Sequence, residues 1–138
     1  MLKSIFLASA IALGASALAS GAKDEVADAT AAARSWLALS DAGNYDQSWD
    51  AAAALFRGAV TKESFVQGLK GVRTPLGAVR SRKVLSATPT HQAPGAPDGD
   101  YVIIQFQTAF EKKAHAIETI TPMKESDGKW HVSGYYIK

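Results

Sequence analysis

The sequence contains no cysteine among its 138 residues. Without thiols the chain cannot form disulfides, a zinc–thiolate site or a cysteine nucleophile, nor carry a lipid on an N-terminal cysteine. It also lacks a strong charge imbalance: 15 Lys and Arg stand against 13 Asp and Glu, a net charge of +2. That excess is too small to suggest a nucleic-acid binder. The hydrophobic share of 47% is that of a globular protein, and the length allows one domain.

The first residues have the layout of a secretory signal peptide. A short positive start ends at Lys3, and an apolar stretch over 5–18 leads into small residues. The sequence therefore predicts a signal peptide over 1–22 that is cleaved after Ala19 or Ala22. A membrane anchor is the alternative, but the apolar stretch is shorter than the roughly 20 residues that a spanning helix needs. We expect a periplasmic or secreted protein with no membrane insertion after processing.

The remaining chain is expected to form a single α+β domain over 23–138. Apolar residues recur at spacings of three and four in its first half and alternate in its second half, so helices come first and strands follow. The predicted helices cover residues 23–40, 45–56 and a third segment that Thr61 caps and that ends before Pro75. The predicted strands cover residues 79–88, 101–110, 114–123 and 130–137. The pattern favours three N-terminal helices packed on one face of a curved four-stranded antiparallel sheet.

Several segments resemble a bacterial secreted family, domain of unknown function 4019. They are residues 36–49 (WLALSDAGNYDQSW), 73–77 (RTPLG), 81–82 (SR), 94–101 (PGAPDGDY) and 127–136 (DGKWHVSGYY), with Glu118 in the third strand. The resemblance covers nearly all of the expected mature chain. It implies export and a cone-like fold of the nuclear-transport-factor-2/cystatin-like group. It carries no established activity, so it transfers no catalytic residues.

Glu118 is the most informative polar residue, because it lies in an expected strand with few other charges. A carboxyl group inside a cone could act as a general acid or base, as in the ketosteroid isomerases, where tyrosines assist it. Tyr45, Tyr135 and Tyr136 are the candidate partners here. Two structural explanations compete with this one. Glu118 forms a buried ion pair with an arginine, or a one-residue register shift turns it towards water.

Basic residues concentrate between positions 61 and 90, where six of them accompany one acidic residue. Arg73, Arg80 and Arg82 are therefore the natural ion-pair partners for Glu118, and the segment is also a candidate patch for an anionic ligand or partner. A solvated strand face, protected by its charge against further strand pairing, explains the same residues. The candidate binding residues are Glu118, Arg80, Arg82, Tyr45 and Tyr135.

Other chemistry finds little support in the sequence. The three histidines are scattered without metal-ligand spacing, and no nucleophile elbow or phosphate-binding glycine loop is present. We therefore expect no metal, no cofactor and no nucleic-acid partner. The tryptophans and phenylalanines fall at helix or strand periods, and Trp36 and Trp49 are expected in the core.

Two functions stay open at this point. The favoured one is a non-catalytic binding or accessory module of the periplasm, whose partner is a protein or a small ligand. The alternative is a small enzyme that uses Glu118 as general acid or base with a tyrosine partner. A cavity of roughly 300 Å³ or more around Glu118 would favour the enzyme. An arginine on its carboxylate, without such a cavity, would favour a structural role.

Overall fold

The computed structural model describes the backbone of residues 14–138 and the side chains of residues 21–138. The start of the expected signal peptide, residues 1–13, lies outside the described residues. In the described part of the chain, no helix combines the length and the apolar character that crossing a bilayer requires.

Over residues 14–138, four α-helices precede four strands. The helices are α1 (Gly14–Asp41), α2 (Tyr45–Ala51), α3 (Ala54–Ala59) and α4 (Lys62–Arg73), and a short 3₁₀ turn, η1 (Thr74–Leu76), follows them. The strands are β1 (Val79–Thr90), β2 (Tyr101–Phe110), β3 (Lys113–Lys124) and β4 (Trp130–Ile137). The predicted order of helices and strands is confirmed, and the bounds of β2 and β4 agree with the expected ones.

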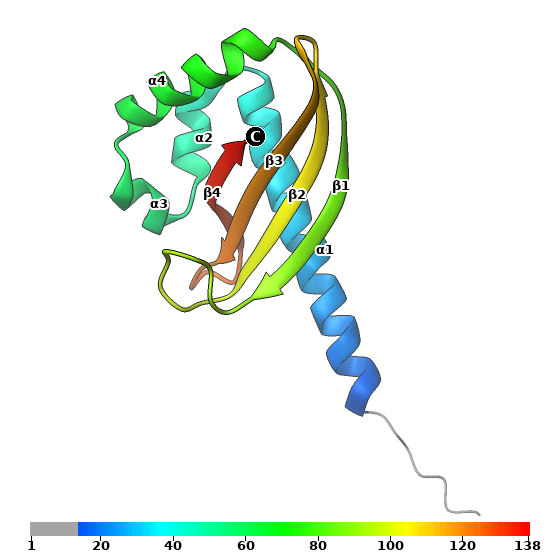
Figure 1. The fold of residues 1–138 in the computed structure, drawn as a ribbon. Coiled ribbons are helices and arrows are strands. Elements are labelled where there is room, and N and C mark those ends of the chain that lie inside the picture. The colour runs from blue at the N-terminus through cyan, green and yellow to red at the C-terminus, as the bar shows by residue number, and fades with distance from the viewer. Residues whose placement is uncertain (1–13) are drawn as a thin grey trace, which may run out of the picture.

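The strands form one open antiparallel sheet in the order β1-β2-β3-β4. Figure 1 shows this sheet as a curved layer, with α1 crossing one face and α2, α3 and α4 gathered on the β4 side, away from β1. We call the face that α1 covers the inner face and the opposite one the outer face. The core between α1, α4 and the inner face includes Ala29, Ala33, Trp36, Leu37, Phe65, Leu69, Val102, Ile104, Phe106, Ile120 and Val132.

The expectation of three helices is wrong, because the second one is broken. Ala52 and Ala53 have extended backbone, with ψ angles of 162° and 148°. The backbone N–H of Ala53 donates to the carbonyl oxygen of Val132 in β4, at 2.8 Å, instead of continuing the helix. A contact with a distant strand thus overrides the local helix propensity of an alanine-rich segment. The first helix also begins earlier than residue 23, at Gly14.

The two tryptophans of the first two helices differ in burial. Trp36 is 3% exposed, and its indole N–H donates to the backbone carbonyl of Ser48 at 2.8 Å. Trp49 is only half-buried at the edge of the core, where its indole N–H donates to the carbonyl of Val60. The expectation of a core position is confirmed for Trp36 and only partly met by Trp49.

Thr61 caps α4 as expected, since its hydroxyl accepts from the amide of Ser64.

Two irregularities interrupt the pairing of β1 with β2. Val79 pairs with Phe110 and Ser81 with Ala109, so Arg80 is an extra residue without a pairing partner on β2. A second shift lies between Val84 and Ser86. Each bulge changes which side chains share a face of the strand. The first one separates Arg80 from Arg82, which would otherwise point the same way.

Candidate functional site

Glu118 lies in the middle of β3 and faces the inner side of the sheet. Its neighbours at spacing two, Ala116 and Ile120, are fully buried, and so is Glu118 at 0% exposure. The alternation of β3 therefore places this carboxyl group in the core layer. It pairs across the sheet with Phe106 on one side and Ile137 on the other. Of the two structural explanations for Glu118, a buried ion pair or a register shift towards water, the register shift is excluded.

The carboxylate of Glu118 accepts hydrogen bonds from three side chains. Arg82 donates from Nε to Oε1 at 2.7 Å and from Nη2 to Oε2 at 3.2 Å. The hydroxyl of Thr108 donates to Oε1, and the hydroxyl of Tyr135 donates to Oε2. Each carboxylate oxygen thus has two donors. Burial of a charge in this way requires such compensation by hydrogen bonds and an opposite charge.

Arg82 extends the contacts to the helices. Its Nη1 and Nη2 donate to Oδ2 and Oδ1 of Asp41 at 2.7 and 3.0 Å. Arg73, which is 5% exposed at the end of α4, also donates to Asp41 Oδ1, at 2.6 Å. The guanidinium of Arg73 lies over the ring of Phe110, 5.1 Å from its centre. We call Asp41, Arg73, Arg82 and Glu118 the ionic network. Its two positive and two negative side chains balance.

The end of α1 explains the position of Asp41. Gly43 adopts a positive φ of 78°, a conformation that glycine reaches without steric cost. The amides of Gly43 and Asn44 then donate to the carbonyls of Ser40 and Leu39 and close the helix. Asp41 is the last helical residue, and its carboxylate accepts hydrogen bonds from Arg82 of β1 and Arg73 of α4.

The charges of the network are held by one another. Burial by itself raises the pKa of Asp41, but the hydrogen bonds from Arg82 and Arg73 outweigh it and keep that pKa below its usual value. Burial likewise disfavours charged Arg82, yet the carboxylates of Asp41 and Glu118 raise its pKa above the usual range. Burial, followed by the negative charge of Glu118, strongly raises the pKa of Tyr135. At neutral pH Tyr135 is a neutral hydrogen-bond donor.

The structure joins three of the five candidate binding residues and leaves two apart. Glu118, Arg82 and Tyr135 meet in one cluster. Arg80 is exposed and, among the described residues, has no hydrogen-bond or ion-pair partner, because the bulge removes it from the row of Arg82. Tyr45 is half-buried at the start of α2, where it packs against the core. Neither residue belongs to the cluster around Glu118, and a role of either in binding stays a prediction.

Sequence reasoning missed Asp41 and Thr108. The sequence predicts Arg73 as a candidate partner for Glu118 or as part of a basic patch, whereas the structure pairs it with Asp41. A signal was present for Asp41 and Arg73, since they lie in the two motifs that cover 36–49 and 73–77. Thr108 had no such signal. Its place opposite Arg82 follows only from the register of β1 and β2.

Within residues 21–138, no three His, Asp or Glu side chains are grouped closely enough to hold a metal ion. His91 instead pairs with Asp100, and His131 pairs with Asp127, both at 2.9 Å. The side chain of His115 is exposed on β3.

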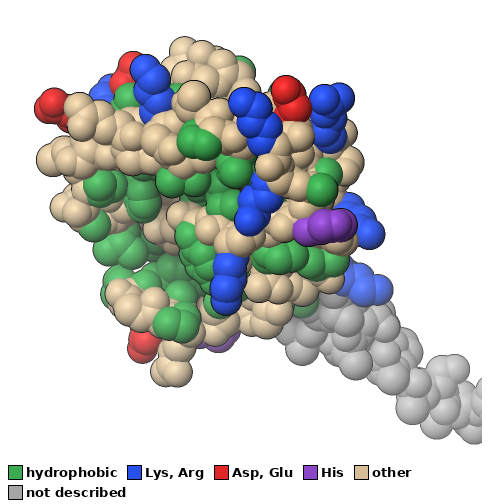
Figure 2. All heavy atoms as spheres, turned by 45° about the horizontal axis from the view of Figure 1, so that its top comes forward, with side chains coloured by type: hydrophobic (Ala, Val, Ile, Leu, Met, Phe, Trp, Pro, Cys, Tyr) green, Lys and Arg blue, Asp and Glu red, His purple; other side chains and the backbone are tan. Residues whose placement is uncertain are grey.

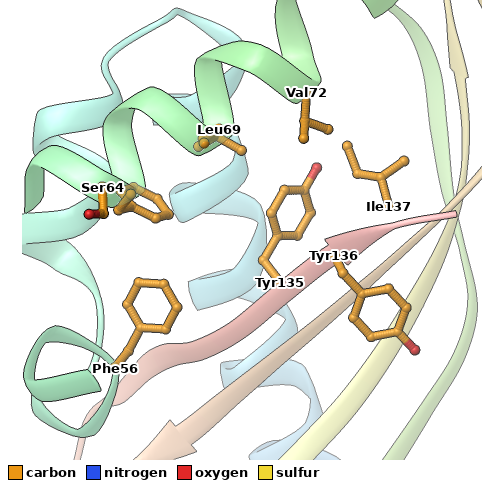
Figure 3. A pocket seen from close by; sticks show the side chains of 9 residues that line it. Phe56, Ser64, Leu69, Val72, Tyr135, Tyr136 and Ile137 are labelled. Carbon is orange, nitrogen blue, oxygen red and sulfur yellow. The ribbon is translucent and has the colours of Figure 1, made fainter. Parts of the chain in front are cut away.

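A groove of about 330 Å³ runs between α4 and β4, beside the network. We call it the α4–β4 groove. Its lining consists of Phe56, Ser64, Phe65, Gly68, Leu69, Val72, Tyr135, Tyr136 and Ile137. Figure 3 shows the ring of Tyr135 pointing from β4 towards α4, with Phe56 at the far end and Val72 above the hydroxyl. Glu118 does not line the groove, since Tyr135 stands between them.

These features define a small α+β domain with an open four-stranded antiparallel sheet and a buried ionic network on its inner face. A family model matches residues 32–135, a range that holds the whole network as well as Thr108 and Tyr135. The chain belongs to the family described as protein of unknown function (DUF4019). A search of curated proteins found no match, and a search of solved structures found none either.

Proposed function

We propose that the protein is a non-catalytic binding module of the periplasm, and that its α4–β4 groove takes a small apolar ligand. One observation carries the proposal. The groove offers an apolar, solvent-connected surface, while the neighbouring acidic group, Glu118, is fully enclosed and has two donors on each oxygen. The region therefore supports binding better than proton transfer.

The enzyme alternative needs Glu118 to exchange a proton with a bound molecule. A general acid or base must reach the reacting group directly or through one water. Here Arg82 neutralises the carboxylate, and Tyr135 separates it from the groove. The raised pKa of Tyr135 keeps its phenol protonated, so it serves as a donor rather than as a base. The contacts of Glu118 support a structural role.

The lining indicates the class of ligand. Aromatic and aliphatic side chains dominate it, and Ser64 supplies a hydroxyl besides the two tyrosines. The volume of about 330 Å³ is at the lower end of the range for small-molecule sites. Val72 is 51% exposed at the rim. An aliphatic or aromatic group that entered the groove would cover this side chain and gain hydrophobic stabilisation.

The proposal is tested with the neutral apolar fluorophore N-phenyl-1-naphthylamine. We expect saturable binding to the parent protein, and a dissociation constant at least about tenfold higher for Val72→Lys, because the ammonium group must keep its hydration at the rim. Val84→Lys is the matched control, since Val84 is 39% exposed on β1, outside the groove. Equal affinity in both variants, or no binding by the parent, would contradict the proposal. Capture of a protein partner that Val72→Lys leaves unchanged would also contradict it.

Export is a separate part of the proposal. The sequence pattern of residues 1–22 supports it. Cleavage after Ala19 or Ala22 would shorten α1 but leave the core packing of α1, which begins with Val26 in the described residues. N-terminal sequencing of the exported protein should start at Ser20 or Lys23. An intact Met1 terminus in the membrane fraction would contradict cleavage.

We also propose that the domain has the cone-like fold of the nuclear-transport-factor-2/cystatin-like group. A long helix laid across the inner face of a curved antiparallel sheet supports this assignment (Figure 1). A crystal structure of this protein, superposed on members of that group, would test the assignment. If the helix and the strands could be matched only in a different order along the chain, the assignment would be refuted.

A further inference from the structure

The outer face of the sheet carries a second hollow, of about 280 Å³, near the turn that joins β2 to β3. It lies across β1, β2 and β3 and is lined by Ser81, Arg82, Lys83, Gln107, Ala109, Ala114 and His115. Strand pairing brings Ser81 opposite Ala109 and Lys83 opposite Gln107.

Basic residues are concentrated in the lining of this hollow and next to it along the chain. Arg80, Lys83, Lys112 and Lys113 are exposed and lie in the lining or within two residues of it, with Glu111 as the one acidic residue at that distance. None of the four forms a salt bridge with an acidic side chain of the described residues, whereas Lys62 and Lys124 elsewhere do. Figure 2 shows Lys and Arg side chains gathered around a histidine on this side of the molecule.

Adjacent like charges repel, and they therefore favour an anion between them. The neighbouring groups are also suited to an anion with several oxygens. The ammonium of Lys83, the hydroxyl of Ser81 and the amide of Gln107 can all donate hydrogen bonds, and His115 adds an imidazole N–H. Arg82 already donates to Asp41 and Glu118, so Lys83 is the charged residue of the lining that is free to bind.

We propose that this outer-face hollow binds the phosphate group of a small soluble molecule. Charge complementarity and the convergence of donors from three strands carry the inference, and the volume leaves room for a modest organic group beside the phosphate. The site is independent of the α4–β4 groove, since the two share no lining residue and lie on different elements. Loss of one proposed site leaves the other intact.

The experiment is a titration of the ¹⁵N-labelled protein with inorganic phosphate at constant ionic strength, followed by amide chemical shifts. We expect saturable shifts at Ser81, Gln107, Ala109 and His115. Lys83→Ala should weaken the binding about tenfold, as expected for the loss of one charge-assisted hydrogen bond. Lys129→Ala, an exposed lysine at the β3–β4 turn, is the matched control and should bind like the parent.

Shifts that rise linearly without saturation, or equal affinities in the two lysine variants, would overturn the proposal. A second measurement distinguishes the phosphate of a soluble molecule from that of a lipid headgroup. Sedimentation with phosphatidylglycerol vesicles should leave the protein in the supernatant. Co-sedimentation that depends on Lys83, without saturable binding of inorganic phosphate, would replace the soluble ligand by a membrane surface and overturn the proposal as stated. Lys83 is exposed on β1, so its replacement should not affect folding.

Discussion

Arg82 and Arg80 lie two residues apart on β1 and have opposite surroundings. Arg82 faces the inner side, where its side chain is 10% exposed and two carboxylates bind it. Arg80 is the extra residue of a bulge and is exposed, without an ion-pair partner among the described residues. The comparison shows that strand register, and not residue type, decides which arginine stabilises the fold. An inner-face charge must be paired, whereas an outer-face charge is available for a ligand.

The largest effect is expected from breaking the buried ion pair between Glu118 and Arg82 on the inner face. Glu118→Gln removes one of the two carboxylates that bind Arg82, so Arg82 and Arg73 are left to share Asp41 and the buried network has one positive charge in excess. We expect a cost of about 3–5 kcal/mol in the free energy of unfolding. Urea denaturation monitored by tryptophan fluorescence would measure it. The cost of the double variant with Arg82→Gln should be well below the sum of the single costs. An unchanged or raised midpoint for Glu118→Gln would show that Glu118 is not structural and would favour the enzyme alternative.

A smaller effect is expected at Tyr135, which lines the α4–β4 groove and donates to Glu118 of the ionic network. Tyr135→Phe removes one hydrogen bond to the buried carboxylate and keeps the ring in place, so we expect a loss of about 2 kcal/mol. Tyr136→Phe is the control, because Tyr136 also lines the groove but is 58% exposed and does not contact Glu118. Equal stability of the two variants would mean that the hydroxyl of Tyr135 contributes nothing to the network.

The network also predicts how stability depends on pH. The pKa of Asp41 is lower in the folded protein than the usual value of about 3.9, because Arg82 and Arg73 overcome the effect of burial. Its contribution is therefore complete above that value and is lost as the pH falls through the folded pKa. The pKa of Tyr135 is raised by burial and by Glu118, so its contribution is lost as the pH rises above about 10.

Thermal melts across this range check both limits. The midpoint should be level at intermediate pH and should fall at either end. Asp41→Asn should reduce the acidic loss, and Tyr135→Phe should reduce the alkaline one. Profiles of both variants that run parallel to the parent would contradict the assignment of these two groups.

Much of the fold could be predicted from the sequence because the strands alternate so regularly. The segment 101–110 places an apolar side chain at nearly every second position, and Asp127-Gly128 marks the turn before the last strand. The break at Ala52 and Ala53 could not be predicted, since its cause is a hydrogen bond to Val132, about 80 positions away along the chain. Local propensity contains no information about such a partner.

The site was harder to predict than the fold, for a related reason. The apolar neighbours of Glu118 favoured its burial but left open a one-residue register shift that would turn it towards water. If it is buried, the cost of a buried charge predicts an arginine partner. The choice among Arg73, Arg80 and Arg82 depended on a bulge of one residue, and Asp41 joined through a turn between two helices. Sequence patterns indicate which side chains share a face of a helix or strand. They do not fix the register between paired strands, nor which distant helices and strands come into contact.

The smallest effect is expected on the outer face, and it makes the comparison sharpest. Arg80→Gln changes the same residue type, on the same strand, as the variant Arg82→Gln. Because the side chain is exposed at a bulge, the free energy of unfolding should change by less than about 0.5 kcal/mol, within the range of ordinary surface substitutions. The same urea denaturation measures both variants, and Arg82→Gln should lose about 3–5 kcal/mol beside it. Losses of similar size at the two positions would mean that the bulge does not separate them, and that Arg80 also reaches the inner face.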